Sequence, residues 1–94
     1  MTKLSVLYWQ SIPTIVEGKD DNGLEKVELS NRFIELVDMV AMKKGLVGTD
    51  EYLNNWRRKR LPVSNKPAKQ CVHDLVKEFE EQYEKIKSDA LALL

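Results

Sequence analysis

Apolar and polar residues alternate through the first third of the chain, and the apolar spacing then becomes helical. Residues 3–9 alternate with apolar side chains on both faces, which is typical of a central strand buried on both sides. Ile12-Pro13 breaks this pattern, because proline cannot donate to a strand ladder. Residues 14–17 are rich in β-branched side chains, and residues 24–29 alternate as a short edge strand. The polar turn between these two segments predicts a hairpin over residues 14–29.

The middle of the chain predicts two helices that are joined at glycines. Ser30 is a suitable N-cap, and apolar residues follow it at helical spacing as far as Lys43. Gly45 can adopt the left-handed conformation that often ends a helix. Thr49 is the expected N-cap of a second, short helix whose apolar face includes Trp56. We therefore expect the two helices to pack as a hairpin.

The last third of the chain predicts one long helix. Pro62 stops any helix that comes before it, and Asn65 is the expected cap of the next one. Apolar residues recur every three or four positions from Ala68 onward, so a helix over residues 67–91 would be about 37 Å long. Its inner half should cover the domain, and its outer half should contact another chain, with a loose tail after Lys85 as the alternative. The residues expected at this interface are Tyr83, Ile86 and Leu93.

These elements predict an α+β fold, in which a small antiparallel three-stranded sheet is packed by a helical hairpin and a long C-terminal helix. We expect residues 1–66 to form the α+β domain. Residues 67–94 should form an amphipathic helix that packs on this domain, so that the chain is one compact unit. A length of 94 residues suits a single small core.

Composition and charge narrow the classes of function. The chain is 43% hydrophobic and 32% charged, which is ordinary for a globular protein, and its formal net charge is +0. Zero net charge argues against a general nucleic-acid coat. No apolar run reaches the roughly 20 residues of a membrane helix, and the N-terminus lacks an export signal. With Cys71 as the single cysteine, no disulfide can form within the chain. We expect a cytoplasmic protein without membrane contact.

One basic run interrupts the mixed charges. Residues 57–60 read Arg-Arg-Lys-Arg, and no acidic residue occurs between Trp56 and His73. Such a run could bind a phosphate, a nucleic-acid backbone or an acidic protein surface. It could also be the solvated end of a helix beside a linker. We favour a protein or an anionic ligand over nucleic acid.

The candidate catalytic and metal-binding patterns are weak. Cys71 and His73 lie two positions apart on a predicted helix and would face different directions, and a zinc site needs three or four ligands. Glu35 and Asp38 share a helix face, but paired carboxylates do acid–base work only in a cleft that shifts their pKa values apart. We interpret both acids as solvated. We therefore expect no metal, no cofactor and no catalytic residue.

Several short pieces of the chain match one known family. They are Leu7-Tyr8-Trp9, Ile12-Pro13, Arg32-Phe33, Val37-Asp38, Ala41-Met42-Lys43, Gly45-Leu46, Asp50, Tyr52-Leu53 and Trp56-Arg57. In these pieces the chain resembles the small domain of the conserved virulence factor C family, over about residues 3–60. The C-terminal helix departs from the family pattern, and we interpret it as added partner surface. The family name records a genetic phenotype, so the resemblance implies no catalytic residue. It does imply stand-alone copies near genes of folate and corrinoid one-carbon metabolism.

The shared pieces contain polar residues that helix packing does not need. Together with the basic run they give the residues expected to bind an anion or a partner, which are Arg32, Lys43, Arg57, Arg58, Lys59 and Arg60. We expect a non-enzymatic protein-interaction module or accessory subunit that binds a protein partner or a second copy of itself. One alternative is a small subunit of a folate or corrinoid one-carbon enzyme complex, linked to methylenetetrahydrofolate. The other is a weak nucleic-acid binder that uses the basic run.

Overall fold

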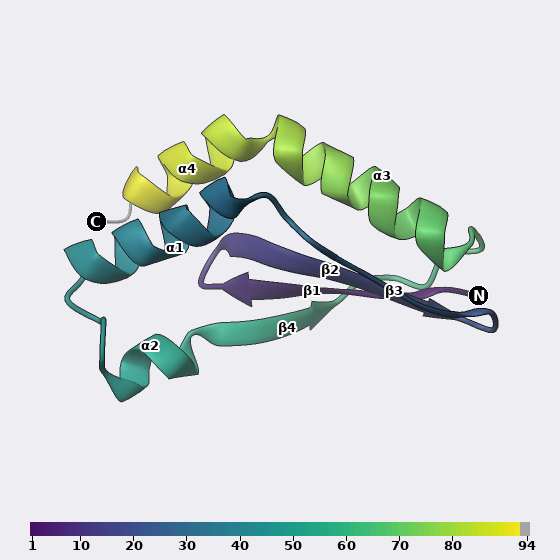
Figure 1. Cartoon of the computed structure of the whole chain (residues 1–94), viewed down its shortest axis with the longest axis horizontal. Coiled ribbons are helices and arrows are strands. Elements are labelled where there is room, and N and C mark those ends of the chain that lie inside the picture. Colours follow the sequence, from purple (N-terminus) through teal and green to yellow (C-terminus); the bar gives the residue numbers. More distant parts are fainter. Residues whose placement is uncertain (93–94) are drawn as a thin grey trace.

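The computed structural model describes residues 1–92 and shows an α+β structure whose main helices lie on one side of an antiparallel sheet (Figure 1). The sheet has four strands in the order β3-β2-β1-β4, one strand more than the sequence predicts. The strands are β1 (Lys3–Trp9), β2 (Ile12–Asp20), β3 (Gly23–Glu28) and β4 (Trp56–Arg60). The helices are α1 (Asn31–Lys43), α2 (Asp50–Asn54), α3 (Ala68–Glu81) and α4 (Tyr83–Ala92).

The three strands predicted from alternation are all present. β1 has the predicted bounds and pairs on both sides, as expected for a central strand. β2 is longer than predicted at both ends. At its start, Pro13 pairs with Tyr8 at a bulge and does not break the strand. Thr14 is the extra residue at this bulge, and its hydroxyl donates to the carbonyl oxygen of Leu7 at 2.8 Å. The hydroxyl thus makes a hydrogen bond to a backbone carbonyl oxygen next to the bulge.

The fourth strand contradicts the sequence prediction. The helix that begins at Asp50 ends at Asn54, and the basic run continues from Trp56 as β4, antiparallel to β1. Four adjacent cations show no alternation of apolar and polar residues, so the run contains no local strand signal. The strand forms because it satisfies the backbone donors and acceptors on the second side of β1.

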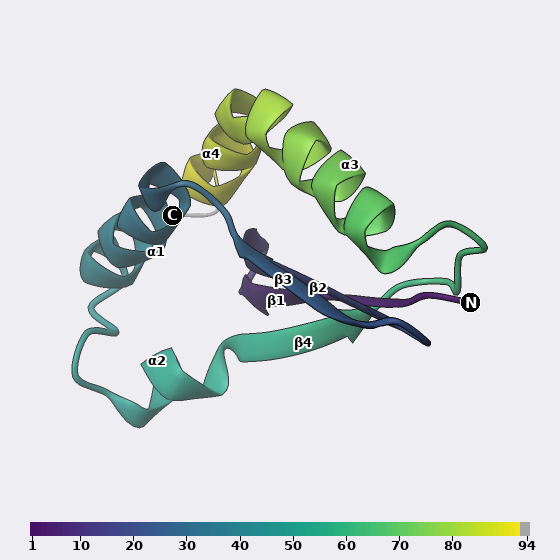
Figure 2. The same cartoon turned by 45° about the vertical axis from the view of Figure 1, so that its right-hand side comes forward.

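The predicted helical hairpin is also wrong. α1 packs against β2 and α4, whereas α2 packs beside β4 (Figure 2). The joint between the two helices is as predicted, since Gly45 and Gly48 both have positive φ angles, 68° and 77°. Thr49 is the N-cap of α2, and its hydroxyl accepts the backbone N–H of Tyr52 at 3.3 Å. Ser30 occupies the N-cap position of α1, but its side chain makes no capping hydrogen bond.

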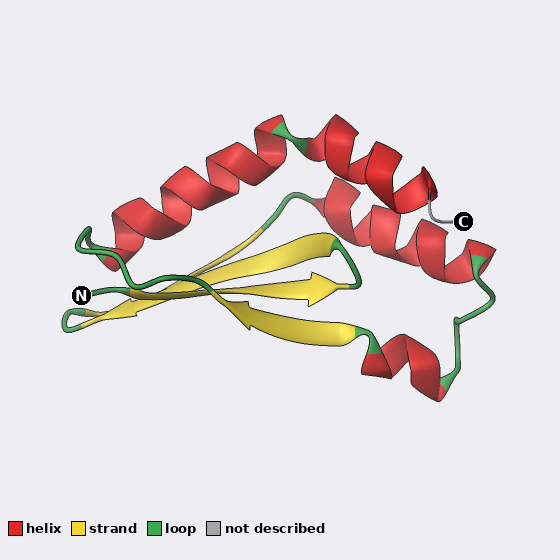
Figure 3. Cartoon of the chain, turned by 180° about the vertical axis from the view of Figure 1, so that it is seen from behind, coloured by secondary structure: helices red, strands yellow, loops and turns green. Residues whose placement is uncertain are grey.

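The long C-terminal helix is divided into two helices. α3 ends at Glu81 and α4 begins at Tyr83, and the chain changes direction between them (Figure 3). α3 lies across β2 and β3, while α4 lies against α1. The outer half of the predicted helix therefore packs on its own domain, which the sequence does not predict. The N-cap of α3 is Pro67 and not Asn65.

A side-chain carboxylate from the sheet takes the place of a local cap on α3. Asp20, at the end of β2, accepts the backbone N–H of Ala68 at 2.8 Å and that of Asn22 at 2.9 Å. Farther along β2, Gly18 lies beneath α3, and a Cβ atom at this position would be 2.8 Å from Cγ2 of Val72. The close approach of α3 to the sheet therefore depends on glycine at this point.

Candidate partner-binding surface

The face of the sheet opposite α3 is partly exposed. Tyr8 lies on the covered face, because its ring meets that of Phe79 in α3 edge to face at 6.4 Å. Neighbouring positions along each strand point to the other side. We call that side the open face, and pairing places on it Lys3, Ser5, Leu7, Ile15, Glu17, Lys19, Trp56, Arg58 and Arg60.

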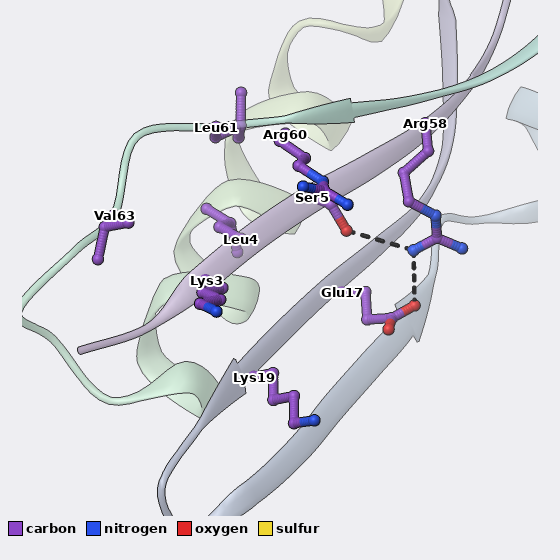
Figure 4. Close-up of a pocket in the computed structure, with 9 residues that line it drawn as sticks. All are labelled: Lys3, Leu4, Ser5, Glu17, Lys19, Arg58, Arg60, Leu61 and Val63. Carbon is purple, nitrogen blue, oxygen red and sulfur yellow. Dashed lines mark hydrogen bonds and ion pairs between the residues drawn. The ribbon is translucent and has the colours of Figure 1, made fainter.

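Arg58 bridges three strands across the open face. Its Nη1 donates to Oε2 of Glu17 in β2 at 3.0 Å and to Oγ of Ser5 in β1 at 3.3 Å (Figure 4). The Arg58 and Glu17 side chains are 50% and 25% exposed, so this pair adds little to stability. Its effect is to hold the guanidinium along the open face, where it lines a pocket.

That pocket is lined by four cationic side chains and one carboxylate. It has a volume of about 460 Å³, and Figure 4 shows its residues around Ser5 and Glu17. Within residues 1–92, the side chains of Lys3, Lys19 and Arg60 make no hydrogen bond or ion pair. The excess of positive charge favours an anion. The complete lining is Lys3, Leu4, Ser5, Glu17, Lys19, Arg58, Arg60, Leu61 and Val63.

The strand geometry divides the basic run between the two sides of the sheet. Arg58 and Arg60 pair with residues of the open face, whereas Arg57 pairs with Tyr8 and Lys59 pairs with Val6 on the covered side. All four residues are exposed, and the main contacts of α3 are with the other three strands. The basic run therefore places positive charge on both sides of this edge of the sheet and does not form one cluster.

Arg32 is placed elsewhere, at the junction of α1 with the end of α3. Its Nη2 donates to the carbonyl oxygen and to the carboxylate of Glu80, at 2.6 Å and 3.0 Å. The centre of its guanidinium also lies 4.2 Å from the centroid of the Tyr83 ring. An external anion would have to compete with Glu80 for this arginine. Lys43 is exposed in the last turn of α1 and does not line the cationic pocket.

The residues expected at an interface lie largely within the domain. Tyr83 is half-buried and meets the ring of Phe33 edge to face at 5.1 Å, and Ile86 is half-buried against the same core. Contact of Tyr83 and Ile86 with another chain stays a prediction, but their packing has an explanation within this chain. Leu93 lies outside the described residues.

The ionisable groups with shifted pKa values have structural roles. Hydrogen bonds from the backbone of Ala68, then of Asn22, lower the pKa of Asp20, and burial raises the pKa of Tyr8. Partial burial of Glu80 opposes its ionisation, but the hydrogen bonds from Ser30 and Arg32 outweigh it and lower its pKa. Two of these three groups hold helix ends in place, and the third packs beneath α3.

Cys71 and His73 make separate contacts. The buried Cys71 thiol donates to the carbonyl oxygen of Lys66 at 3.5 Å, and Nε2 of His73 lies 3.3 Å from a carboxylate oxygen of Glu25. Within residues 1–92, no three His, Cys, Asp or Glu side chains are grouped closely enough to hold a metal ion. In the same part of the chain, no helix combines the length and apolar character that crossing a membrane requires.

Sequence reasoning missed the part of the pocket that lies on β1 and β2. Lys3, Ser5, Glu17 and Lys19 occupy every second position of their strands, so the alternation does place them on one face. What the pattern lacks is the neighbouring strand, because the basic run has no alternation that would predict β4. Without β4 beside β1, nothing connects these four residues to Arg58.

Most of the chain matches one known family. The sequence model of the family described as "Virulence factor" matches residues 7–92. The match includes α3 and α4, so the expectation that the C-terminal helix departs from the family pattern is wrong. No curated protein matches the chain, and no solved structure matches it.

Proposed function

We propose that this chain, which belongs to the virulence factor family, is a non-enzymatic protein-interaction module that serves as an accessory subunit. The observation that carries the proposal is the uncovered edge of the sheet at β4. Four exposed cationic residues lie along this edge, two on each side of the sheet, and three of them have no side-chain partner within residues 1–92. Arginine-rich surface of this kind is common in protein interfaces. Charge complementarity would make an acidic partner surface associate quickly and selectively.

The shifted pKa values support a structural interpretation of the ionisable groups. Catalytic acids and bases are usually found among groups whose pKa values are strongly perturbed in a cleft. Here Asp20 and Glu80 have lowered pKa values because they accept hydrogen bonds at helix ends, and neither lines the cationic pocket. These carboxylates stabilise the scaffold that presents the open face.

Affinity capture from the source cells tests this proposal. We expect the tagged chain to retain a defined set of proteins, and the double variant Arg58→Glu, Arg60→Glu to lose them. The control is Lys85→Glu, which changes an exposed cation on α4. If the double variant folds and retains the same proteins as the wild type, the basic edge is not the binding surface and the proposal is wrong.

The cationic pocket favours a second candidate, a small subunit of a one-carbon enzyme complex. A ligand with carboxylates and an apolar body could place its charges beside Arg60 and Lys19 and its body against Leu61 and Val63. Methylenetetrahydrofolate has both features. Calorimetric titration of the chain with this compound should then give saturable binding that Arg60→Ala weakens. Absence of saturable binding would exclude this candidate.

A further inference from the structure

We propose that β4 binds an acidic, extended segment of the partner as an additional strand of the sheet. This inference rests on the proposed function and specifies the chemistry of the partner and the mode of contact. Addition of a strand to a free sheet edge supplies main-chain hydrogen bonds for affinity and alternate side chains for specificity.

The register of β4 shows which of its backbone groups point outward. The backbone N–H of Leu61 donates to the carbonyl oxygen of Leu4 at 2.9 Å, and that of Gln10 donates to Asn55 at 3.1 Å. In an antiparallel ladder, hydrogen-bonded pairs alternate with pairs that are not bonded. Arg57 and Lys59 therefore direct their backbone groups toward β1. The alternate residues of β4 direct theirs away from the sheet, and these are Trp56, Arg58 and Arg60.

These outward groups have no partner among the described residues. β4 is the last strand of the sheet, and besides β1 it contacts mainly the short helix α2, which directly precedes it in the chain. Figures 1 and 2 both show β4 along the side of the molecule away from α3 and α4. Two exposed apolar residues, Leu53 and Val63, flank the strand and are 64% and 53% exposed. The edge thus offers unpaired donors and acceptors between two apolar side chains.

The charge of the edge selects the segment that can add to it. A residue opposite Arg58 or Arg60 would lie about 5.5 Å away between Cα atoms, near enough for an acidic side chain to pair with the arginine. A second copy of β4 would instead bring four cations against four, which disfavours pairing between copies. The other edge, β3, has outward residues of mixed character, namely Leu24, Lys26 and Glu28. β4 is therefore the edge that selects acidic segments.

The open face suits a peptide better than a nucleic acid. Glu17 lies between Arg58 and Lys19, where it would repel a phosphate backbone. Single-stranded nucleic acids also need exposed aromatic rings for stacking. The aromatic residue that pairing places beside Arg58 on this face is Trp56, which is half-buried and packed against Tyr52.

The test uses a labelled peptide of about eight residues that alternates glutamate and valine, with both ends blocked. Fluorescence anisotropy at low salt should show saturable binding to the full chain, and a peptide with lysine in place of glutamate should not bind. N-methylation of the glutamate amides, which would face β4 when glutamate lies opposite Arg58 and Arg60, should weaken binding about tenfold or more. N-methylation of the valine amides should leave binding unchanged, because those amides face away.

Variants of Arg60 separate the backbone contribution from that of the side chain. Arg60→Ala removes the charge, and Arg60→Pro also removes the outward N–H without breaking the ladder to β1. The proline variant should therefore bind the peptide more weakly than the alanine variant. Lys26→Pro on β3 removes an outward N–H from the other edge and should not affect binding. Circular dichroism would establish that each variant is folded.

Strand addition would be wrong if the acidic peptide does not bind, or if the two N-methylated peptides bind equally well. It would also be wrong if the Arg60→Ala and Arg60→Pro variants bind the peptide equally well. Binding of single-stranded RNA that depends on the outward N–H would likewise contradict it. A dimer that Arg60→Pro dissociates would instead identify a second copy as the occupant. If capture from cells depends on Arg58 and Arg60 while N-methylation has no effect, the proposed function stands and strand addition is wrong. If capture is independent of both arginines, the proposed function itself fails.

Discussion

The carboxylate of Glu80 accepts two hydrogen bonds from Ser30, one from its backbone N–H and one from its hydroxyl, each at 2.8 Å and across 50 positions of sequence. Arg32 donates to the same carboxylate. The last turn of α3 thereby fixes the start of α1. Glu80→Gln should reduce the free energy of unfolding by about 1 kcal/mol at neutral pH, a value lowered for the partial exposure of this group. Urea denaturation measures this difference.

The same contact predicts a pH dependence. The folded-state pKa of Glu80 is lowered, so its contribution is fully present above the unfolded value of about 4.3 and is lost as the pH falls through the folded-state pKa. The stability difference between wild type and Glu80→Gln should therefore shrink below about pH 4. Asp20, whose pKa is also lowered, should leave some acid sensitivity in the variant. If the stability difference between wild type and Glu80→Gln stays constant down to about pH 2.5, the charge of Glu80 is not involved.

Gly18 in β2 should resist substitution. Glycine to alanine in a strand is usually favourable, but here the new Cβ would meet Cγ2 of Val72 at 2.8 Å and the carbonyl oxygen of Ala68 at 3.4 Å. We expect Gly18→Ala to cost about 1–3 kcal/mol through overpacking. Thermal denaturation followed by circular dichroism would measure the loss.

A double variant tests the cause of that loss. Val72→Ala alone leaves a cavity and should also destabilise the chain. Combined with Gly18→Ala, it removes the atom that clashes, so the two changes together should cost less than the sum of the single changes. Strict additivity would show that the strain at Gly18 comes from elsewhere.

The predictable part of the fold is the part with a local signal. The alternation in β1 and β3 and the left-handed glycine at position 45 are properties of neighbouring residues, and the sequence predicts them. β4 has no local signal in the sequence. It is a strand because β1 lies beside it. The division at Gln82 likewise leaves the apolar spacing unchanged, and beyond it Tyr83 packs on Phe33, which is 50 positions away in the sequence. The basic run was singled out from charge alone, but its partners on β1 and β2 required the tertiary structure.

Trp9 should anchor α2 to the sheet. Its Nε1 donates to the carbonyl oxygen of Tyr52 at 2.9 Å, and the two rings lie 5.7 Å apart. Trp9→Phe removes this hydrogen bond and leaves space in the core, so we expect a loss of about 2 kcal/mol and faster amide exchange in α2. Trp56→Phe is the matched control, because Trp56 is half-buried and its indole makes no hydrogen bond within residues 1–92. Equal effects of the two changes would argue against an anchoring role for Trp9.

Ile86 distinguishes an internal role of α4 from an interface role. The side chain is half-buried, and it packs against the domain core together with Tyr83. A glutamate at this position would bring a charge into apolar surroundings, so Ile86→Glu should reduce the free energy of unfolding by about 2 kcal/mol. Lys85→Glu, one residue earlier and exposed, should change it by less than about 0.5 kcal/mol.

Urea denaturation and light scattering on the two variants decide between these roles. A destabilised Ile86→Glu with the oligomeric state of the wild type would place Ile86 in the core. An Ile86→Glu variant as stable as the wild type, but with a partner or second copy lost, would assign Ile86 to an interface between chains. In that case α4 would present apolar surface outward, and its packing against α1 would contribute less to stability than the contact between Phe33 and Tyr83 indicates.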